Sequence, residues 1–395
     1  MGLLYFDQTQ DDSTMKQAPR GNISPFLVME AFREAEEVAR GGADVIHLSL
    51  GQPARKAPRR VLEKVSQLAL NAQLGYTDAR GMESLRHRIS AYYHEQYGMD
   101  VPMERIFVTV GSSAAYFMSL IAAFEPGDKI AISAPCYPAY PNIMRALELE
   151  PVFMRTGLEE NYHPTVDMLK ALPEKPAGLV IASPSNPTGT VIDADVLHDV
   201  IRYCEAEGIR LISDEIYHGV TYGDVACKSA LEYSDRMIVT NSFSKYFLLP
   251  GWRLGWAVMP EDLQRNFESL VQNFFISPPA IAQHAAVEVF DCLDELDKVV
   301  QGYEINRQIL LDALPKAGFD KLSPAQGAFY IYADVSGLTD DSTAFCRKML
   351  EEAHVCAVAG PDFDREEGHN YVRFSYAGDS GRINEACERL KRWLG

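Results

Sequence analysis

Long apolar runs are scarce in this 395-residue chain. A membrane-spanning helix needs roughly 18–20 consecutive apolar residues. The longest run, residues 114–124, is shorter and is interrupted by Ser119, so we interpret it as a buried helix. The N-terminal sequence MGLLYFDQTQDDSTMKQ is polar and acidic, whereas a secretory signal begins basic and continues apolar. We therefore expect a cytoplasmic protein that does not associate with membranes.

Basic charge and cysteine are also in short supply. Lys and Arg number 37 against 55 Asp and Glu, giving a formal net charge of −18. Nucleic-acid binding usually needs a basic face, so we expect no nucleic-acid partner. The seven cysteines are widely spaced and odd in number, which favours reduced core residues over disulfides. None of their spacings is typical of metal ligands, and we expect no metal site.

The glycine-rich fingerprints of nucleotide-binding proteins are missing as well. The chain contains neither G-x-G-x-x-G nor a P-loop lysine, which argues against a nucleotide-dependent oxidoreductase. Instead, short apolar runs rich in β-branched residues alternate with helical patterns between about residues 104 and 260. Seven of these runs predict strands, at residues 106–110, 129–133, 151–154, 178–182, 209–213, 237–240 and 254–258.

Strands separated by helices predict an α/β fold, in which a large domain contains a mostly parallel seven-stranded sheet covered by helices. The plainest helix is 194–207, which Gly208 is placed to end. Both chain ends are expected to build a smaller α+β domain. Residues 1–50 are predicted to form an N-terminal arm and part of that domain, residues 51–290 the large domain, and residues 291–395 the small C-terminal domain. Further helices are predicted near 62–70, 82–93, 140–147 and 296–315, and further strands at 327–332 and 371–375.

Lys245 directly follows a predicted buried strand, and ligands of parallel sheets bind beyond the carboxyl ends of the strands. A partly desolvated lysine loses its proton more easily and becomes a nucleophile toward carbonyl groups. Arg253 can offer a fork of donors to a phosphate or carboxylate, and the hydroxyls of Ser242 and Ser244 add phosphate donors. A surface lysine near a structural arginine is the alternative explanation of this segment alone.

Polar residues follow other predicted strands in the same way. Asp214 follows strand 209–213, where its carboxylate could hold a ring nitrogen in its protonated state. Tyr217 is placed to donate to a phenolic oxygen, although a helix N-cap explains an acidic residue here nearly as well. In the rigid loop 182–189, Asn186 is the one side-chain amide, and a plain turn is its alternative explanation. Tyr137 follows another strand and could stack on a flat ring.

The segment 110–114 offers a site for a single phosphate. Gly111, Ser112 and Ser113 stand between a predicted strand and a helix, where free backbone N–H groups and the helix dipole favour an anion. Taken together, the segments supply a phosphate cradle, a carboxylate for a ring nitrogen, donors for a phenolic oxygen, a stacking aromatic residue and a nucleophilic lysine.

In these segments the chain resembles the class I/II aminotransferases, which have fold type I of the pyridoxal-phosphate enzymes. The resemblance extends from about residue 20 to the C-terminus. The shared features, in order, are Leu48-Ser-Leu-Gly-Gln-Pro53, Gly75-Tyr76, Ser185-Asn-Pro-Thr-Gly189, Asp214-Glu-x-Tyr217, Ser242-x-Ser-Lys245, Gly251-x-Arg253, Gly327-x-Phe-Tyr330 and Arg373.

The resemblance implies a role for each of these residues around pyridoxal 5'-phosphate. Lys245 would carry the cofactor as a Schiff base and shuttle a proton, while Asp214 would keep the pyridine nitrogen protonated. Asn186 and Tyr217 would hydrogen-bond the ring oxygen, and Tyr137 would stack on the ring. The phosphate would be bound by Ser112, Ser113, Ser242 and Arg253.

The substrate and the subunit arrangement follow from the same resemblance. Arg373 would bind the substrate α-carboxylate, with the backbone of Gly51 beside it, and Asn186 would also line the substrate site. Tyr76 resembles the tyrosine that reaches the phosphate of a neighbouring subunit, which implies a homodimer. We expect a ping-pong aminotransferase that moves the amino group of an L-amino acid to a 2-oxo acid.

The substrate class and the reaction type leave alternatives open. After Pro53 the chain has Ala-Arg-Lys-Ala-Pro58, where related enzymes often carry an acidic residue and a phenylalanine. No second substrate-binding arginine is evident, although Arg55, Lys56 or Arg80 could serve, so a neutral or apolar amino acid is favoured over a dicarboxylate. A pyridoxal-phosphate-dependent lyase or decarboxylase is the nearest alternative reaction. A regulator with this fold as a sensor domain would need an added basic DNA-binding region, for which the N-terminus has no room.

Overall fold

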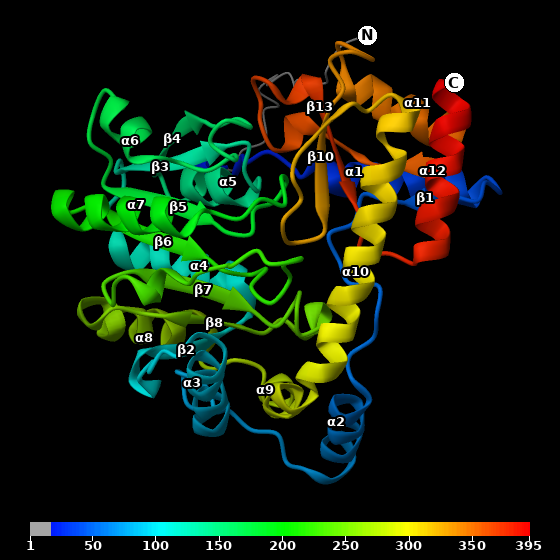
Figure 1. Ribbon diagram of the computed structural model, residues 1–395. Coiled ribbons are helices and arrows are strands. Elements are labelled where there is room, and N and C mark those ends of the chain that lie inside the picture. The colour runs from blue at the N-terminus through cyan, green and yellow to red at the C-terminus, as the bar shows by residue number, and fades with distance from the viewer. Residues whose placement is uncertain (1–16) are drawn as a thin grey trace.

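A sheet of seven strands forms the larger part of the molecule (Figure 1). The computed structural model describes residues 17–395, so the first part of the expected N-terminal arm lies outside the described residues. The strand order is β2-β8-β7-β6-β5-β3-β4. Strands β7, β6, β5, β3 and β4 are mutually parallel, whereas β8 runs antiparallel to both β7 and β2. The bounds are β2 (Ile106–Thr109), β3 (Lys129–Ala134), β4 (Glu150–Arg155), β5 (Gly178–Ala182), β6 (Arg210–Asp214), β7 (Ile238–Ser242) and β8 (Gly255–Val258).

Both faces of this sheet are apolar, and helices cover each of them. Val180, Ile212 and Ile238 pack on one face with residues of α4 (Gly111–Ala123), α5 (Ala139–Ala146) and α8 (Glu261–Phe275). Their sequence neighbours Leu179 and Leu211 point to the opposite face, as period-two alternation requires. There they join the cluster that contains residues of α3 (Glu83–Tyr97) and α7 (Ala194–Glu207). The predicted α/β fold with a mostly parallel sheet is confirmed.

The direction of β8 corrects one feature of the predicted site. The segments that carry polar residues were expected to follow successive parallel strands, but Arg253 precedes β8 rather than following a strand. Because β8 is antiparallel, its first residue lies at the same edge of the sheet as the last residues of β7 and β2. Gly255 is accordingly paired with both Ser242 and Thr109. Arg253 therefore lies at the predicted edge because it precedes an antiparallel strand, not because it follows a parallel one.

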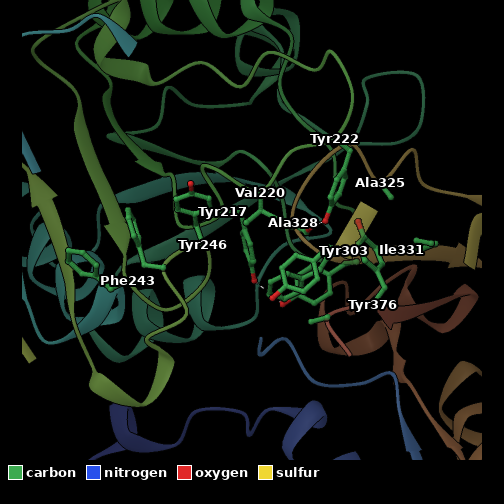
Figure 2. Packing of buried hydrophobic residues seen from close by; sticks show 14 of the residues in the cluster. Tyr217, Val220, Tyr222, Phe243, Tyr246, Tyr303, Ala325, Ala328, Ile331 and Tyr376 are labelled. Carbon is green, nitrogen blue, oxygen red and sulfur yellow. Dashed lines mark hydrogen bonds between the residues drawn. The ribbon is translucent and has the colours of Figure 1, made fainter. Parts of the chain in front are cut away.

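A four-stranded antiparallel sheet, in the order β12-β13-β10-β9, forms the smaller part of the molecule. It comprises β9 (Lys321–Leu322), β10 (Tyr330–Asp334), β12 (Val358–Ala359) and β13 (Tyr371–Ser375). The predicted strand 327–332 begins only at Tyr330, because Gly327 bridges Thr221 and the Ala328 N–H donates to the Val220 carbonyl. In Figure 2 these contacts bring Val220 and Tyr222 close to Ala325, Ala328 and Tyr376.

The N-terminal segment joins the C-terminal part of the chain. Strand β1 (Ile46–His47) pairs in parallel with β11 (Val355–Cys356), and α1 (Leu27–Arg40) packs beside β12 and α11 (Ser342–Ala353). The long helix α10 (Leu293–Ala313) packs on α12 (Ser380–Leu394), and α2 (Arg59–Asn71) on α9 (Ala280–Val289) (Figure 1). The remaining helix is α6 (Val166–Ala171). The proposed domain boundaries near residues 50 and 290 stay a prediction.

Four further observations bear on the predictions made from the sequence. Helix α7 spans the predicted residues 194–207, and Gly208 ends it in the left-handed conformation with φ of 69°. All seven cysteines are free thiols. Within residues 17–395, no helix is long and apolar enough to cross a membrane, and no group of His, Cys, Asp and Glu side chains is arranged to hold a metal ion.

Candidate active site

The carboxyl edge of the large sheet collects most of the residues that the sequence singled out. Asp214, the last residue of β6, is paired with Ala182 at the end of β5 and with Thr240 near the end of β7. The loops that leave β5 and β7 at this point carry Asn186 and Lys245. Strand register alone therefore places the amide, the carboxylate and the lysine at one edge.

Lys245 lies within this edge, with its amine partly buried. Its Nζ donates to the Gly51 carbonyl oxygen at 2.6 Å and lies 5.6 Å from the centre of the Tyr217 ring. The pKa of Lys245 is lowered to about 8, chiefly because burial disfavours the ammonium and also because Arg373 and Arg253 add positive charge nearby. A lysine in this setting reaches its neutral, nucleophilic form much closer to physiological pH than an ordinary lysine.

Asp214 is buried and is held on both carboxylate oxygens. Its Oδ2 accepts a hydrogen bond from the Tyr140 hydroxyl at 2.6 Å, and its Oδ1 accepts one from the Ile216 N–H at 3.2 Å. Burial raises the pKa of Asp214, although these hydrogen bonds oppose the shift. A carboxylate that is oriented but short of positive charge fits a cationic partner such as a protonated ring nitrogen.

The aromatic residue predicted to stack on a ring stands next to this carboxylate. Tyr137 packs edge-to-face on Tyr140, with ring centroids 5.4 Å apart, and Tyr140 in turn contacts Asp214 through its hydroxyl. Tyr140 was not singled out from the sequence. Its position three residues after Tyr137 was visible there, but nothing in the sequence identified the partner of its hydroxyl.

A candidate phosphate site lies at the start of α4. A methyl group added at Gly111 would come within 2.4 Å of the Arg253 guanidinium, and one added at Gly255 would come within 2.7 Å of the Ser112 N–H. The two glycines therefore let Arg253 and β8 approach the N-terminus of α4 closely, and an arginine beside a helix N-terminus favours an anion. Arg253 itself adopts the left-handed conformation, with φ of 51°. The residues present fit a phosphate group.

The three serines assigned to the phosphate differ in their surroundings. Ser112 is half-buried and Ser113 is exposed, both in the first turn of α4. The hydroxyl of Ser242 is buried and donates to Ser244 Oγ at 2.9 Å. In this arrangement Ser244 is the acceptor and Ser242 the donor, so the hydroxyl of Ser242 is engaged within its own loop.

Arg373 reaches the same region from β13 of the smaller sheet. It is 3% exposed, and its Nη1 and Nη2 donate to Asn186 Oδ1 at 2.9 Å and to the Ser49 carbonyl at 2.6 Å. Its Nε is buried with no hydrogen-bond partner among residues 17–395. A buried guanidinium with an unused donor fits an anionic ligand, because leaving such a group unpaired costs free energy.

Tyr217 lies beside these groups and contacts a residue that was not assigned a role from the sequence. Its hydroxyl is 2.8 Å from the hydroxyl of Tyr330 in β10. Burial raises the pKa of Tyr217 well above its usual value, so the phenol keeps its proton. The sequence had marked Tyr330 only as part of a shared motif.

The remaining candidates lie apart from this cluster. Tyr76 is in the loop before α3 and is 82% exposed. The side chain of Arg80 pairs with Glu268 of α8 at 2.6 Å, which turns it toward that helix. Arg55 and Lys56 are exposed in the segment that follows Gly51.

Comparison with known proteins identifies the family of this chain. The family model of class I and II aminotransferases matches residues 43–390. The valine–pyruvate aminotransferase of Mycobacterium tuberculosis is 42% identical over 96% of this chain and 99% of its own length. Two solved structures are also similar. An aminotransferase from M. tuberculosis gives a TM-score of 0.95 at 42% identity, covering 96% of this chain and 99% of that one. A mutant of the Thermus thermophilus aspartate aminotransferase gives 0.90 at 28% identity, covering 96% and 100%.

The chain therefore belongs to the class I and II aminotransferases, a family whose members depend on pyridoxal phosphate. It is an aminotransferase, an enzyme that transfers the amino group of an amino acid to a 2-oxo acid.

Proposed function

We propose that this aminotransferase binds pyridoxal phosphate through Lys245 and follows a ping-pong mechanism with L-amino acids whose side chains are neutral or apolar. The observation that carries the proposal is the surroundings of Lys245, a partly buried amine of lowered pKa. The same edge holds Asp214 and the candidate phosphate site at Gly111. When bound, the cofactor supplies a ring that withdraws electrons from the substrate α-carbon.

The side chains at this edge have separate tasks in the proposal. Lys245 moves the proton at the substrate α-carbon, for which a pKa near the working pH is suited. Asp214 is held by Tyr140 and would pair with the ring nitrogen, and Tyr137, which packs on Tyr140, would lie against the ring face. Asn186 and Tyr217 face the ring oxygen. The phosphate would be held by Ser112, Ser113 and Arg253, and by Ser242 once its hydroxyl turns from Ser244.

The preference for neutral or apolar substrates rests on which cationic side chains are free to bind a second substrate carboxylate. Arg373 is the only buried arginine among the described residues, and it is assigned to the α-carboxylate. Arg80 is paired with Glu268 and does not compete for a second carboxylate. The relative that is 42% identical is a valine–pyruvate aminotransferase, which acts on a neutral amino acid. A dicarboxylate substrate is the second candidate, since the structure also resembles an aspartate aminotransferase and Arg55 and Lys56 are exposed near Gly51.

The test is a half-reaction with purified holoenzyme and one L-amino acid at a time, without any oxo acid. We expect the visible absorption of the bound cofactor to be lost stably, with release of one oxo acid per site, fastest for valine and alanine. Adding pyruvate should then restore the band and form alanine. If aspartate or glutamate reacts fastest, the dicarboxylate candidate replaces ours. Catalytic release of carbon dioxide or ammonia would favour a decarboxylase or lyase, and no cofactor band after adding pyridoxal phosphate would refute the proposal.

The lowered pKa of Lys245 predicts how cofactor capture depends on pH. The folded-state pKa is about 8 rather than 10.5, so the neutral amine is gained as the pH rises through about 8. The capture rate of apoenzyme should rise by about tenfold per pH unit below that value and level off above it. Stopped-flow absorbance with pyridoxal phosphate measures the rate, and Lys245→Ala provides the blank. A midpoint near that of an ordinary lysine would contradict the burial argument.

We also propose that the active unit is a homodimer in which Tyr76 reaches the phosphate of the neighbouring subunit. The support is the 82% exposure of Tyr76 in a loop close to α8, which exposes Phe274 near its end. Light scattering should give twice the mass of one chain. The Tyr76→Phe variant should stay dimeric but release pyridoxal phosphate more readily in equilibrium dialysis. A monomer with full activity would contradict this arrangement.

A further inference from the structure

The hydroxyl group of Tyr330 lies at the centre of the candidate site, between groups assigned to cofactor and substrate. Tyr330 is the first residue of β10 and is fully buried. It contacts Tyr217, Arg373 and the backbone of Gly51. Each of these three has a task in the proposed function, whereas Tyr330 itself has none so far.

The first contact is a hydrogen bond between two phenols. The hydroxyls of Tyr217 and Tyr330 are 2.8 Å apart, and either can be the donor. If Tyr217 donates to the ring oxygen of the cofactor, its own oxygen is left as an acceptor, and Tyr330 is the hydroxyl in reach that can donate to it. Burial raises the pKa of both phenols and Arg373 opposes that rise in both, but only the pKa of Tyr217 is raised well above its usual value. Tyr330 is therefore the more acidic phenol and the better donor.

The second contact supports the substrate-binding arginine. The Arg373 guanidinium lies over the Tyr330 ring, 4.4 Å from its centroid, and over the Phe363 ring at 4.8 Å. A guanidinium stacked on an aromatic face keeps its donors in the ring plane free for hydrogen bonds. The Tyr330 ring therefore packs against the Arg373 guanidinium and helps to hold it in place for a carboxylate.

The third contact lies on the side of Lys245. A methyl group added at Gly51 would come within 2.0 Å of the Tyr330 oxygen, so only glycine lets the phenol approach the backbone this closely. The carbonyl of the same Gly51 accepts the hydrogen bond of Lys245 Nζ. Tyr330 thus packs against the peptide segment that holds the lysine.

We propose that Tyr330 is a positioning residue that links the two ends of the site. Its hydroxyl holds Tyr217 as a donor to the ring oxygen of the cofactor, and its ring holds Arg373 in place for the substrate carboxylate. The inference rests on the proposed function. The hydroxyl and the ring of Tyr330 have separate roles, and each can be removed by its own substitution.

The hydroxyl is tested with the holoenzyme of Tyr330→Phe. The readout is the pH midpoint at which the visible absorption of the bound cofactor titrates. Loss of the hydroxyl should raise this midpoint, because a less firmly held Tyr217 stabilises the anionic ring oxygen less. Tyr217→Phe should raise it more, and Tyr217→Phe/Tyr330→Phe should equal Tyr217→Phe alone, since Tyr330 acts through Tyr217. Additive shifts in the double variant, or an unchanged midpoint in Tyr330→Phe, would overturn the role of the hydroxyl.

The ring is tested by binding of 2-methylalanine, which has no α-hydrogen for Lys245 to remove. Tyr330→Phe keeps the ring and should bind it as the wild type does, whereas Tyr330→Leu should bind it about twofold to thirtyfold more weakly. Equal affinity in the wild type and Tyr330→Leu would overturn the role of the ring. If Tyr330→Leu does not fold, an affinity in Tyr330→Phe as weak as that of Arg373→Ala would overturn it as well.

The matched control is Tyr332→Phe. Tyr332 is buried in the same strand, and its hydroxyl has no hydrogen-bond partner among the described residues. This variant should leave both the spectral midpoint and the affinity for 2-methylalanine unchanged. The wild-type enzyme distinguishes failure of the proposed function from failure of the role inferred for Tyr330. A wild type without a cofactor band refutes the proposed function, whereas a normal wild type with an unaffected Tyr330→Phe refutes only the present inference.

Discussion

Lys245→Ala is expected to remove essentially all transamination activity. The variant loses both the amine that holds the cofactor and the base for the substrate α-proton. General acid–base catalysis alone contributes about 10²- to 10⁴-fold, and the loss of covalent attachment adds to this. We therefore expect kcat to fall by at least about 10³-fold. The measurement is single-turnover formation of oxo acid from L-valine by reconstituted enzyme.

Two controls separate this loss from a general defect. Lys228→Ala removes a lysine that pairs with Glu232 at 2.8 Å, at a position outside the candidate site, and should leave turnover unchanged. Lys245→Ala itself should fold, because it removes an amine whose charge is disfavoured by burial. Compared as apoenzymes at neutral pH, the variant and the wild type should have similar thermal midpoints. Activity near that of the wild type in Lys245→Ala would show that another residue holds the cofactor.

Much of the large sheet could be predicted from the sequence, because most of its strands are buried on both faces. Buried parallel strands are continuous apolar runs, and each of the seven predicted runs became a strand. The direction of the strands was harder to predict from the sequence than their positions. A parallel connection needs a crossover of about a dozen residues or more, usually a helix. Residues 243–254 contain only a short 3₁₀ turn at Pro250–Trp252, a signal that is consistent with the antiparallel β8 but does not by itself determine it.

Position in the sheet predicted only those candidate-site residues that follow a strand, whereas Arg373, inside β13, was predicted from the family resemblance. Asp214, Asn186 and Lys245 were found from their positions after strands, since the edge of a parallel sheet brings such positions together. Tyr140 and Tyr330 were not assigned roles, because their hydroxyls meet Asp214 and Tyr217 across long separations in the chain. The ion pair of Arg80 with Glu268 could not be predicted either, because it depends on how α8 packs.

Arg373→Ala is expected to weaken the binding of α-carboxylates rather than to change the chemistry at the α-carbon. Truncating one partner of a buried charge pair costs about 2–5 kcal/mol, which is about 30-fold to 5,000-fold in Kd. The variant also leaves Asn186 Oδ1 and the Ser49 carbonyl without their donors. KM for L-valine should therefore rise far more than kcat falls, and Kd for 2-methylalanine should rise in parallel.

Replacing Arg373 by lysine distinguishes the contribution of positive charge from that of the planar guanidinium. Arg373→Lys keeps a positive charge but has neither the planar fork nor the stacking surface that lies over Tyr330 and Phe363. We expect it to recover only part of the lost affinity. As a control, Arg382→Ala removes an arginine that pairs with Asp44 on the surface and should leave KM unchanged. An unchanged KM in Arg373→Ala would mean that the carboxylate is bound elsewhere, and Arg55 would then be the next candidate. Full recovery in Arg373→Lys would mean that charge alone accounts for binding, which would remove the reason for Arg373 to be stacked on Tyr330.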